Sequence, residues 1–130
     1  MTEERLCPYF FAYGTLRRGA RKDLLDLVGS GARLLGRASA AGRLYDLGTY
    51  PGMLDAARDG ERVFGDLYEL DHPQSILNRL DEYEGEDFRR EIRSVSVDGR
   101  GPVDAWVYLF QGPVGVGRRI ASGDYFKGKG

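Results

Sequence analysis

Glu84 is the residue whose chemistry its sequence context explains least. Residues 71–85 have the signals of a helix, because Asp71 can cap the N-terminus, Pro73 is tolerated in the first turn and Gly85 suits the C-terminal turn. At about 100° per residue, Glu84 falls inside the apolar stripe of that helix. The other members of the stripe are Ile76, Leu77, Leu80 and Tyr83. An ionised carboxylate turned toward a core is unfavourable without a partner, so Glu84 needs a structural or a functional explanation.

Two interpretations of Glu84 follow from this position. As a structural residue it would form a buried ion pair, for which Arg79, Arg89 and Arg90 are candidates. As a catalytic residue it would have a raised pKa, because of desolvation, the neighbouring acids and the negative end of its own helix. Those acids are Asp81, Glu82, Glu86 and Asp87. A carboxyl group that titrates near neutral pH can act first as a general base and then as a general acid.

A second candidate site is the turn Tyr13-Gly14-Thr15-Leu16, which follows an apolar run at residues 9–13. Because the strand is left through a glycine, successive backbone N–H groups could converge on an anion such as a substrate carboxylate. Alternatively, Gly14 only serves a tight turn and the arginines that follow are solvated. The segment lacks the lysine and the spacing of a phosphate-binding loop, so it does not predict a nucleotide site.

Cys7 and His72 are the single cysteine and the single histidine of the chain. The sequence neither brings them together nor supplies an orienting third group, which disfavours a nucleophile and base pair. One cysteine forms no internal disulfide, and the usual cysteine and histidine set of a structural zinc site is missing. We therefore expect no metal site and a reducing, cytoplasmic location.

The elements that position these residues are mostly strands. Strand-like patterns occur at residues 9–13, 32–47, 63–70, 92–97 and 103–110, and glycines within 32–47 indicate a strand that bends. A brief helix is predicted around residues 24–28, in addition to the one at 71–85. Turn signals lie at residues 50–52, 59–60 and 98–101. Several strands with a few helices predict an α+β domain.

Aromatic residues in or beside these predicted strands could line a pocket, but strand aromatics are more often part of a core. They are Tyr45, Tyr50, Tyr68, Trp106 and Tyr108. We expect the core role for each of them.

The composition limits the classes of function. At 130 residues and 42% hydrophobic content, the chain suits one domain over residues 1–130, with its core at about 9–125. The 19 basic and 20 acidic side chains are interleaved, which argues against a nucleic-acid-binding protein. No apolar run approaches the roughly 20 residues that span a bilayer, so we expect no membrane segment. An unpaired strand edge could support a homodimer.

Several segments, in their order and spacing, resemble the gamma-glutamylcyclotransferase-like family, in particular its gamma-glutamylamine cyclotransferase-like branch. The two central ones are the turn at residues 13–16 and the sequence Leu-Asp-Glu-Tyr-Glu-Gly at residues 80–85. The others are residues 43–52, 65–70, 105–108 and 122–125. The resemblance covers about residues 9–125.

This resemblance implies a compact α+β fold, a small mixed β-barrel with flanking helices, and a substrate cavity between the turn and the glutamate. Family members release 5-oxoproline from gamma-glutamyl amino acids or gamma-glutamylamines without a metal or organic cofactor, and others have no established substrate. The substrate's α-amine attacks its own γ-carbonyl, so positioning is most of the task. By resemblance, Glu84 is catalytic, and Tyr13, Gly14, Thr15 and Leu16 bind the substrate.

Three departures from the family pattern leave the leaving amine open. Phe88 stands where family members often have tyrosine, Asp66 where glutamate is frequent, and Tyr125 where tryptophan is frequent. Pocket walls choose the leaving amine, so these changes bear on substrate and not on the catalytic group. Two alternatives remain: a noncatalytic module that binds a small ligand or a protein on the same fold, and a cyclotransferase for a specialised gamma-glutamylated biosynthetic intermediate.

Overall fold

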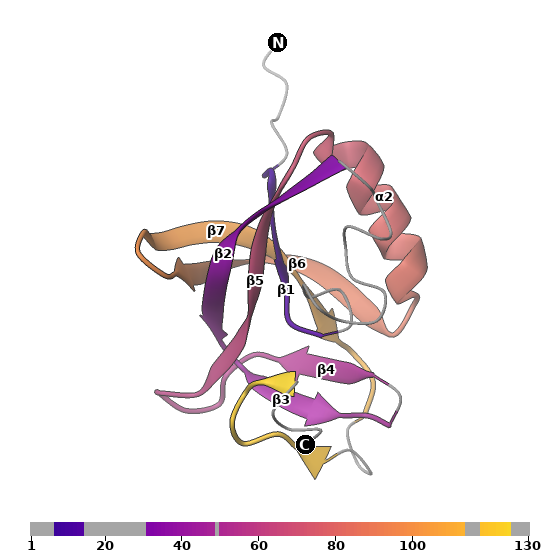
Figure 1. Cartoon of the computed structure of the whole chain (residues 1–130). Helices are drawn as coiled ribbons and strands as arrows, with labels where there is room; N and C mark the ends of the chain where they lie inside the picture. The colour runs from indigo at the N-terminus through magenta and orange to yellow at the C-terminus, as the bar shows by residue number, and fades with distance from the viewer. Residues whose placement is uncertain (1–6, 15–30, 49, 114–117, 126–130) are drawn as a thin grey trace.

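Five strands of this protein close into a small mixed barrel (Figure 1). The computed structural model describes residues 7–14, 31–48, 50–113 and 118–125. Around the barrel the strands follow the order β1 (Tyr9–Ala12), β5 (Arg62–Leu70), β2 (Ala32–Ala41), β6 (Phe88–Val97) and β7 (Gly101–Phe110). β7 then pairs with β1 in parallel, at Phe10 and Trp106, whereas the other neighbours in the ring are antiparallel. Closure leaves no free edge within the ring.

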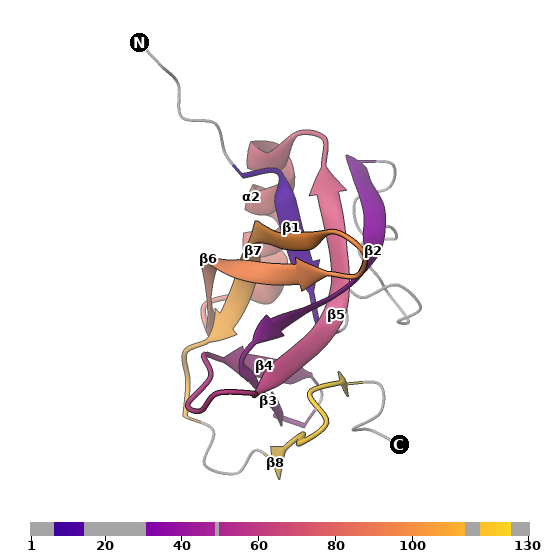
Figure 2. The same cartoon turned by 90° about the vertical axis from the view of Figure 1, so that its left-hand side faces the viewer.

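A small hairpin extends the sheet at one end of the barrel (Figure 2). It consists of β3 (Arg43–Asp46) and β4 (Pro51–Leu54), with the short β8 (Arg118–Arg119) beside β3. β4 joins the barrel through a parallel pairing of Met53 with Leu109 of β7. The hairpin thereby brings Pro51 to the end of the barrel where β1 stops.

Helix α2 (Pro73–Glu84) covers the outer face of β1, β5 and β7 (Figure 1). Successive side chains of a strand point to opposite faces. Both faces of β1 are covered, and this is why its residues are apolar throughout. Phe11 packs in the barrel interior, and Phe10 packs outward with Leu77 and Leu80 of the helix. The same alternation sets the direction of the chain as it leaves β1 at Tyr13.

The single bending strand predicted at residues 32–47 is two strands in the structure, β2 and β3. Strand β2 contains an irregularity of the kind that the glycines predicted. It pairs with β5 along its length and with β6 at its end, and its register with β5 shifts between Leu34 and Gly36. Gly36 has a φ of 150°, which side-chain-bearing residues rarely adopt. This irregularity lets one strand belong to both sides of the barrel.

The α+β fold with a small barrel is confirmed, and the strands predicted at 9–13, 63–70 and 103–110 are present within a few residues. β6 begins at Phe88, four residues earlier than predicted. The sequence pattern missed its first half because the side chains there are mostly charged and partly exposed. Within the described residues the structure has one helix, α2; the helix predicted around residues 24–28 lies outside them.

Two local predictions are wrong. Residues 50–52 were predicted as a turn, but Pro51 opens β4, a position where its missing N–H is tolerated. Asp71 does not cap α2; the N-cap residue is His72, and its side chain makes no capping hydrogen bond. The predicted C-terminal signal is correct, because Gly85 has a φ of 83° and donates its N–H to the Asp81 carbonyl at 3.0 Å.

Among the described residues, no helix is long and apolar enough to cross a membrane.

Candidate active site

A cavity of about 380 Å³ opens between the end of α2, the end of β1 and the start of β4. Tyr13, Gly14 and Glu84 are all in its wall. Tyr50 and Tyr108 are also in its wall, together with Phe10, Phe11, Ala12, Pro51, Tyr83 and Phe88. The structure therefore brings the glutamate and the first half of the turn, both singled out from sequence, to one cavity.

Glu84 is the last residue of α2, and its side chain is partly buried in the cavity wall. Ile76, Leu77 and Leu80 of the same helix are buried against the barrel, and this packing turns Glu84 inward with them. Burial raises the pKa of the Glu84 carboxyl from 4.5 to about 7. The carboxyl group can therefore both accept and release a proton near neutral pH.

Desolvation is the cause of this shift, and the neighbouring acids are not. Glu82, Glu86 and Asp87 are exposed to solvent, where their charges are screened. Asp81 is neutralised by Arg90, which donates to its two carboxylate oxygens at 2.9 and 3.0 Å. The raised pKa of Glu84 was predicted from sequence, but the part of the shift assigned to neighbouring acids is not present, because those acids are exposed or paired with Arg90.

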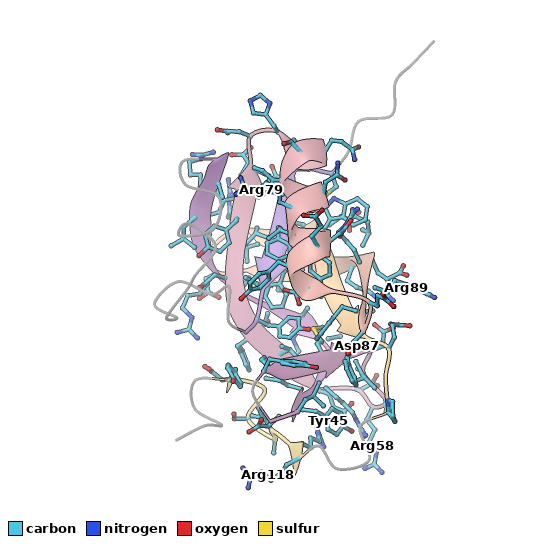
Figure 3. The ribbon with its side chains drawn as sticks, turned by 90° about the vertical axis from the view of Figure 1, so that its right-hand side faces the viewer. Tyr45, Arg58, Arg79, Asp87, Arg89 and Arg118 are labelled. Carbon is cyan, nitrogen blue, oxygen red and sulfur yellow. The ribbon has the colours of Figure 1, made fainter. Side chains whose placement is uncertain are left out.

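The structural interpretation of Glu84 as half of an ion pair is not supported. Of the three candidate partners, Arg90 binds Asp81, and Arg89 lies 3.6 Å from the carboxylate of Glu91. Figure 3 shows Arg79 on the side of α2 toward β2 and β5, and Arg89 near the opposite edge of the view, on β6. Within the described residues no arginine or lysine forms an ion pair with Glu84.

Tyr13 is buried and its hydroxyl joins three strands. The hydroxyl donates to the Tyr108 carbonyl at 2.6 Å and accepts the Met53 N–H at 3.1 Å. Burial raises the pKa of Tyr13 far above its ordinary value, and the nearby charge of Glu84 adds to this effect. Because its single donor is already used, Tyr13 anchors the wall of the cavity through β1, β4 and β7.

Gly14 is required by a close contact. A Cβ atom at this position would lie 2.4 Å from Cγ of Pro51, and Gly14 does not have a positive φ. The absence of a side chain at Gly14 thus lets the β4 hairpin close over the end of β1. The sequence had suggested only that Gly14 serves a tight turn. The other two predicted binding residues, Thr15 and Leu16, lie outside the described residues.

The sequence missed the polar support behind the cavity. The Tyr108 hydroxyl donates to Asp81 at 2.6 Å, so strand β7 is bound to the last turn of α2 through the carboxylate that Arg90 also holds. The Arg90 guanidinium is the main cause of the lowered pKa of Asp81. Tyr108 was expected to be a core residue; it is buried and also lines the cavity, and no local pattern distinguishes the two roles.

The remaining aromatic candidates divide in the same way. Tyr50 was also expected in the core, but it is exposed, lines the cavity and has its ring 5.9 Å from that of Phe88. Tyr68 is buried between the barrel and α2, as expected. Figure 3 shows Tyr45 on the β3 hairpin, far from α2, and it does not line the cavity. In the described part of the chain, no three histidine, cysteine, aspartate or glutamate side chains gather as a metal site would need.

Comparison with known proteins identifies the family. A family model described as gamma-glutamyl cyclotransferase, AIG2-like, matches residues 10–127. The chain belongs to this family. The gamma-glutamylaminecyclotransferase of Bos taurus is 35% identical over an alignment of 117 residues, and the match covers 80% of this chain and 66% of the bovine protein. The gamma-glutamyl cyclotransferase family assignment therefore rests on most of the chain.

Several solved structures have the same fold as this protein. YkqA from Bacillus subtilis matches with a TM-score of 0.75 at 23% identity, over 94% of this chain and 40% of that protein. An AIG2-like protein from Mus musculus matches with a TM-score of 0.68 at 24% identity, over 84% of this chain and 81% of that protein. At these identities the structural matches establish the fold alone.

Proposed function

We propose that this protein is a gamma-glutamyl cyclotransferase that releases 5-oxoproline and a free amine from a gamma-glutamyl compound. The observation that carries the proposal is the state of the Glu84 carboxyl. This group lines the cavity, has a pKa of about 7, and has no ion-pair partner among the described residues. A proton carrier in this reaction needs those properties. The name of the bovine relative supports a gamma-glutamylamine as one substrate class.

The part of the cavity wall at Tyr13 and Gly14 would hold the glutamyl end of the substrate. The backbone that leaves β1 through Tyr13 and Gly14 would bind the substrate's α-carboxylate, and the proposal extends to Thr15 and Leu16. This arrangement would direct the α-ammonium group toward Glu84, which lines the same cavity. Holding both reacting groups of one molecule in contact is the main contribution that the protein must make.

The proposed chemistry moves two protons from one nitrogen to another. Glu84 takes a proton from the α-ammonium group, and the freed amine attacks the γ-carbonyl carbon to form a C–N bond and a tetrahedral intermediate. Glu84 returns that proton to the leaving nitrogen, whose bond to carbon then breaks. The ring nitrogen loses its second proton by the same route, so the amine leaves as an ammonium ion. The carboxylate ends the cycle as it began.

Product analysis tests this proposal. Purified protein is incubated with gamma-glutamyl amino acids, gamma-glutamyl-ε-lysine and simple gamma-glutamylamines, and products are quantified by mass spectrometry. We expect 5-oxoproline and the free amine in equal amounts from at least one compound. Glutamate in place of 5-oxoproline would identify a hydrolase, and binding without any product would favour the noncatalytic module.

A further inference from the structure

A second cavity adjoins the first and has a different character. It has a volume of about 460 Å³ and is lined by Asp81, Gly85, Phe88, Arg90, Trp106 and Tyr108. Phe88 and Tyr108 also line the cavity that contains Glu84, so the two spaces meet at these side chains. Because the two cavities are adjacent, one elongated ligand could contact both.

Arg90 is held in a fixed orientation in the wall of this second cavity. Its guanidinium lies over the Trp106 ring, 4.4 Å from the centroid, and binds Asp81 through Nε and one terminal nitrogen. Trp106 is fixed in turn, because its indole N–H donates to the Cys7 carbonyl at 2.9 Å. These contacts occupy one face of the guanidinium and two of its five N–H donors. The remaining N–H donors along its edge are suited to bind a planar anion.

A cationic ligand finds no comparable partner in this cavity. The Asp81 carboxylate already accepts two hydrogen bonds from Arg90 and one from the Tyr108 hydroxyl. One face of the Trp106 ring already carries the Arg90 cation, and a second cation beside it would be repelled by the guanidinium charge. The chemistry of the site therefore favours a ligand with an anionic group for Arg90 and an apolar body for Phe88 and Trp106.

We propose that the second cavity binds the leaving amine of the substrate and that Arg90 selects leaving amines that carry a carboxylate. The inference rests on the proposed function, because it assumes that the glutamyl end occupies the cavity of Glu84. It assigns Arg90 as a specificity-determining residue. The substrate class it names is gamma-glutamyl amino acids with an apolar or aromatic side chain.

Two substrates that differ only in the carboxylate test the inference. Gamma-glutamyl-phenylalanine and gamma-glutamyl-phenethylamine share the same ring and the same scissile amide. We expect kcat/KM to be about tenfold higher for the phenylalanine compound, as a charge-assisted hydrogen bond in a partly exposed site would give. Arg90→Met should abolish this preference, and Arg90→Lys, which keeps the charge but not the fork, should retain part of it.

Arg93 provides a matched control on the same strand. It binds Asp55 with the same two-point geometry, at 2.8 and 2.9 Å, but it does not line the second cavity. Arg93→Met removes an equivalent ion pair, so it should leave the preference between the two substrates unchanged. The ratio is the readout because general destabilisation lowers both rates and leaves their ratio unaltered.

Binding measurements separate failure of the inference from failure of the proposed function. Calorimetry with Glu84→Gln, which should bind without turnover, should show the same tenfold preference for gamma-glutamyl-phenylalanine. Turnover of both compounds at equal kcat/KM would overturn the role of Arg90 and leave the cyclotransferase intact. Preferential binding that Arg90→Met abolishes, without turnover by the wild type, would support the role of Arg90 and overturn the cyclotransferase. Equal binding of both compounds by Glu84→Gln would also overturn the inference.

Discussion

Replacing Glu84 with glutamine is expected to lower kcat for 5-oxoproline release by about a thousandfold. The amide keeps the size of the side chain but cannot carry a proton between two nitrogens, and a positioned acid–base group typically contributes 10²–10⁴. Because the α-carboxylate is proposed to bind at the backbone of Tyr13 and Gly14 rather than at Glu84, substrate affinity should change by less than about fivefold. Initial rates measured by mass spectrometry and calorimetric binding together check both parts.

Glu82→Gln is the control for this experiment. Glu82 is exposed on the same helix, two residues away, and does not line the cavity. The control makes the same chemical change outside the site, so it should keep the wild-type rate. A folded Glu84→Gln variant within tenfold of wild type would remove Glu84 from the mechanism.

Gly65→Ala is expected to destabilise the protein by about 3 kcal/mol, at the upper end of the effects of overpacking. An added Cβ at Gly65 of β5 would lie 2.2 Å from the Ala12 carbonyl oxygen and 3.0 Å from Cα of Tyr13. Both contacts are backbone atoms in the closed barrel, so neither can yield by a side-chain rotation. Because β1 carries the cavity wall at Tyr13, activity should fall together with the midpoint of urea unfolding.

Gly31→Ala is the matched substitution for this test. Among the described residues, an added Cβ at Gly31 would meet only the side chain of Ile76, with its flexible terminal Cδ1 at 3.0 Å and Cγ1 at 3.8 Å. We expect a change in the free energy of unfolding within about 1 kcal/mol, since most substitutions without backbone strain or cavities have small effects. Equal stabilities for Gly65→Ala and wild type would show that β1 and β5 are not packed as closely as described.

The catalytic candidate could be found from sequence because its signal is local. Helical periodicity places Glu84 on the face of Ile76, Leu77 and Leu80, and the helix forms with that face against the barrel. Tyr83 shows the limit of helical periodicity, since it belongs to the apolar stripe by angle but is 44% exposed and lines the cavity. Helical periodicity predicts which face of a helix is apolar. It does not predict how far along the helix the barrel continues to cover that face.

The support for the site could not be found from sequence because it depends on distant pairings. Asp81, Arg90 and Tyr108 lie on α2, β6 and β7, and only the barrel register brings them into contact. The reason for Gly14 is also remote, because Pro51 reaches it only after the hairpin folds back. Single-sequence patterns report neighbours along an element, and these contacts join elements through tertiary pairing.

The role of Glu84 as the proton carrier is tested by measuring its ionisation and the pH dependence of turnover on the same protein. The raised pKa means that Glu84 is protonated, and unable to act as a base, below about pH 7. We therefore predict that kcat/KM falls about tenfold per pH unit below an apparent pKa of about 7. A carbon-13 NMR titration of the Glu84 carboxyl, assigned by its loss in Glu84→Gln, should give the same value. A Glu84 carboxyl that titrates at its ordinary pKa of 4.5, or a rate that does not follow its titration, would contradict this role of Glu84.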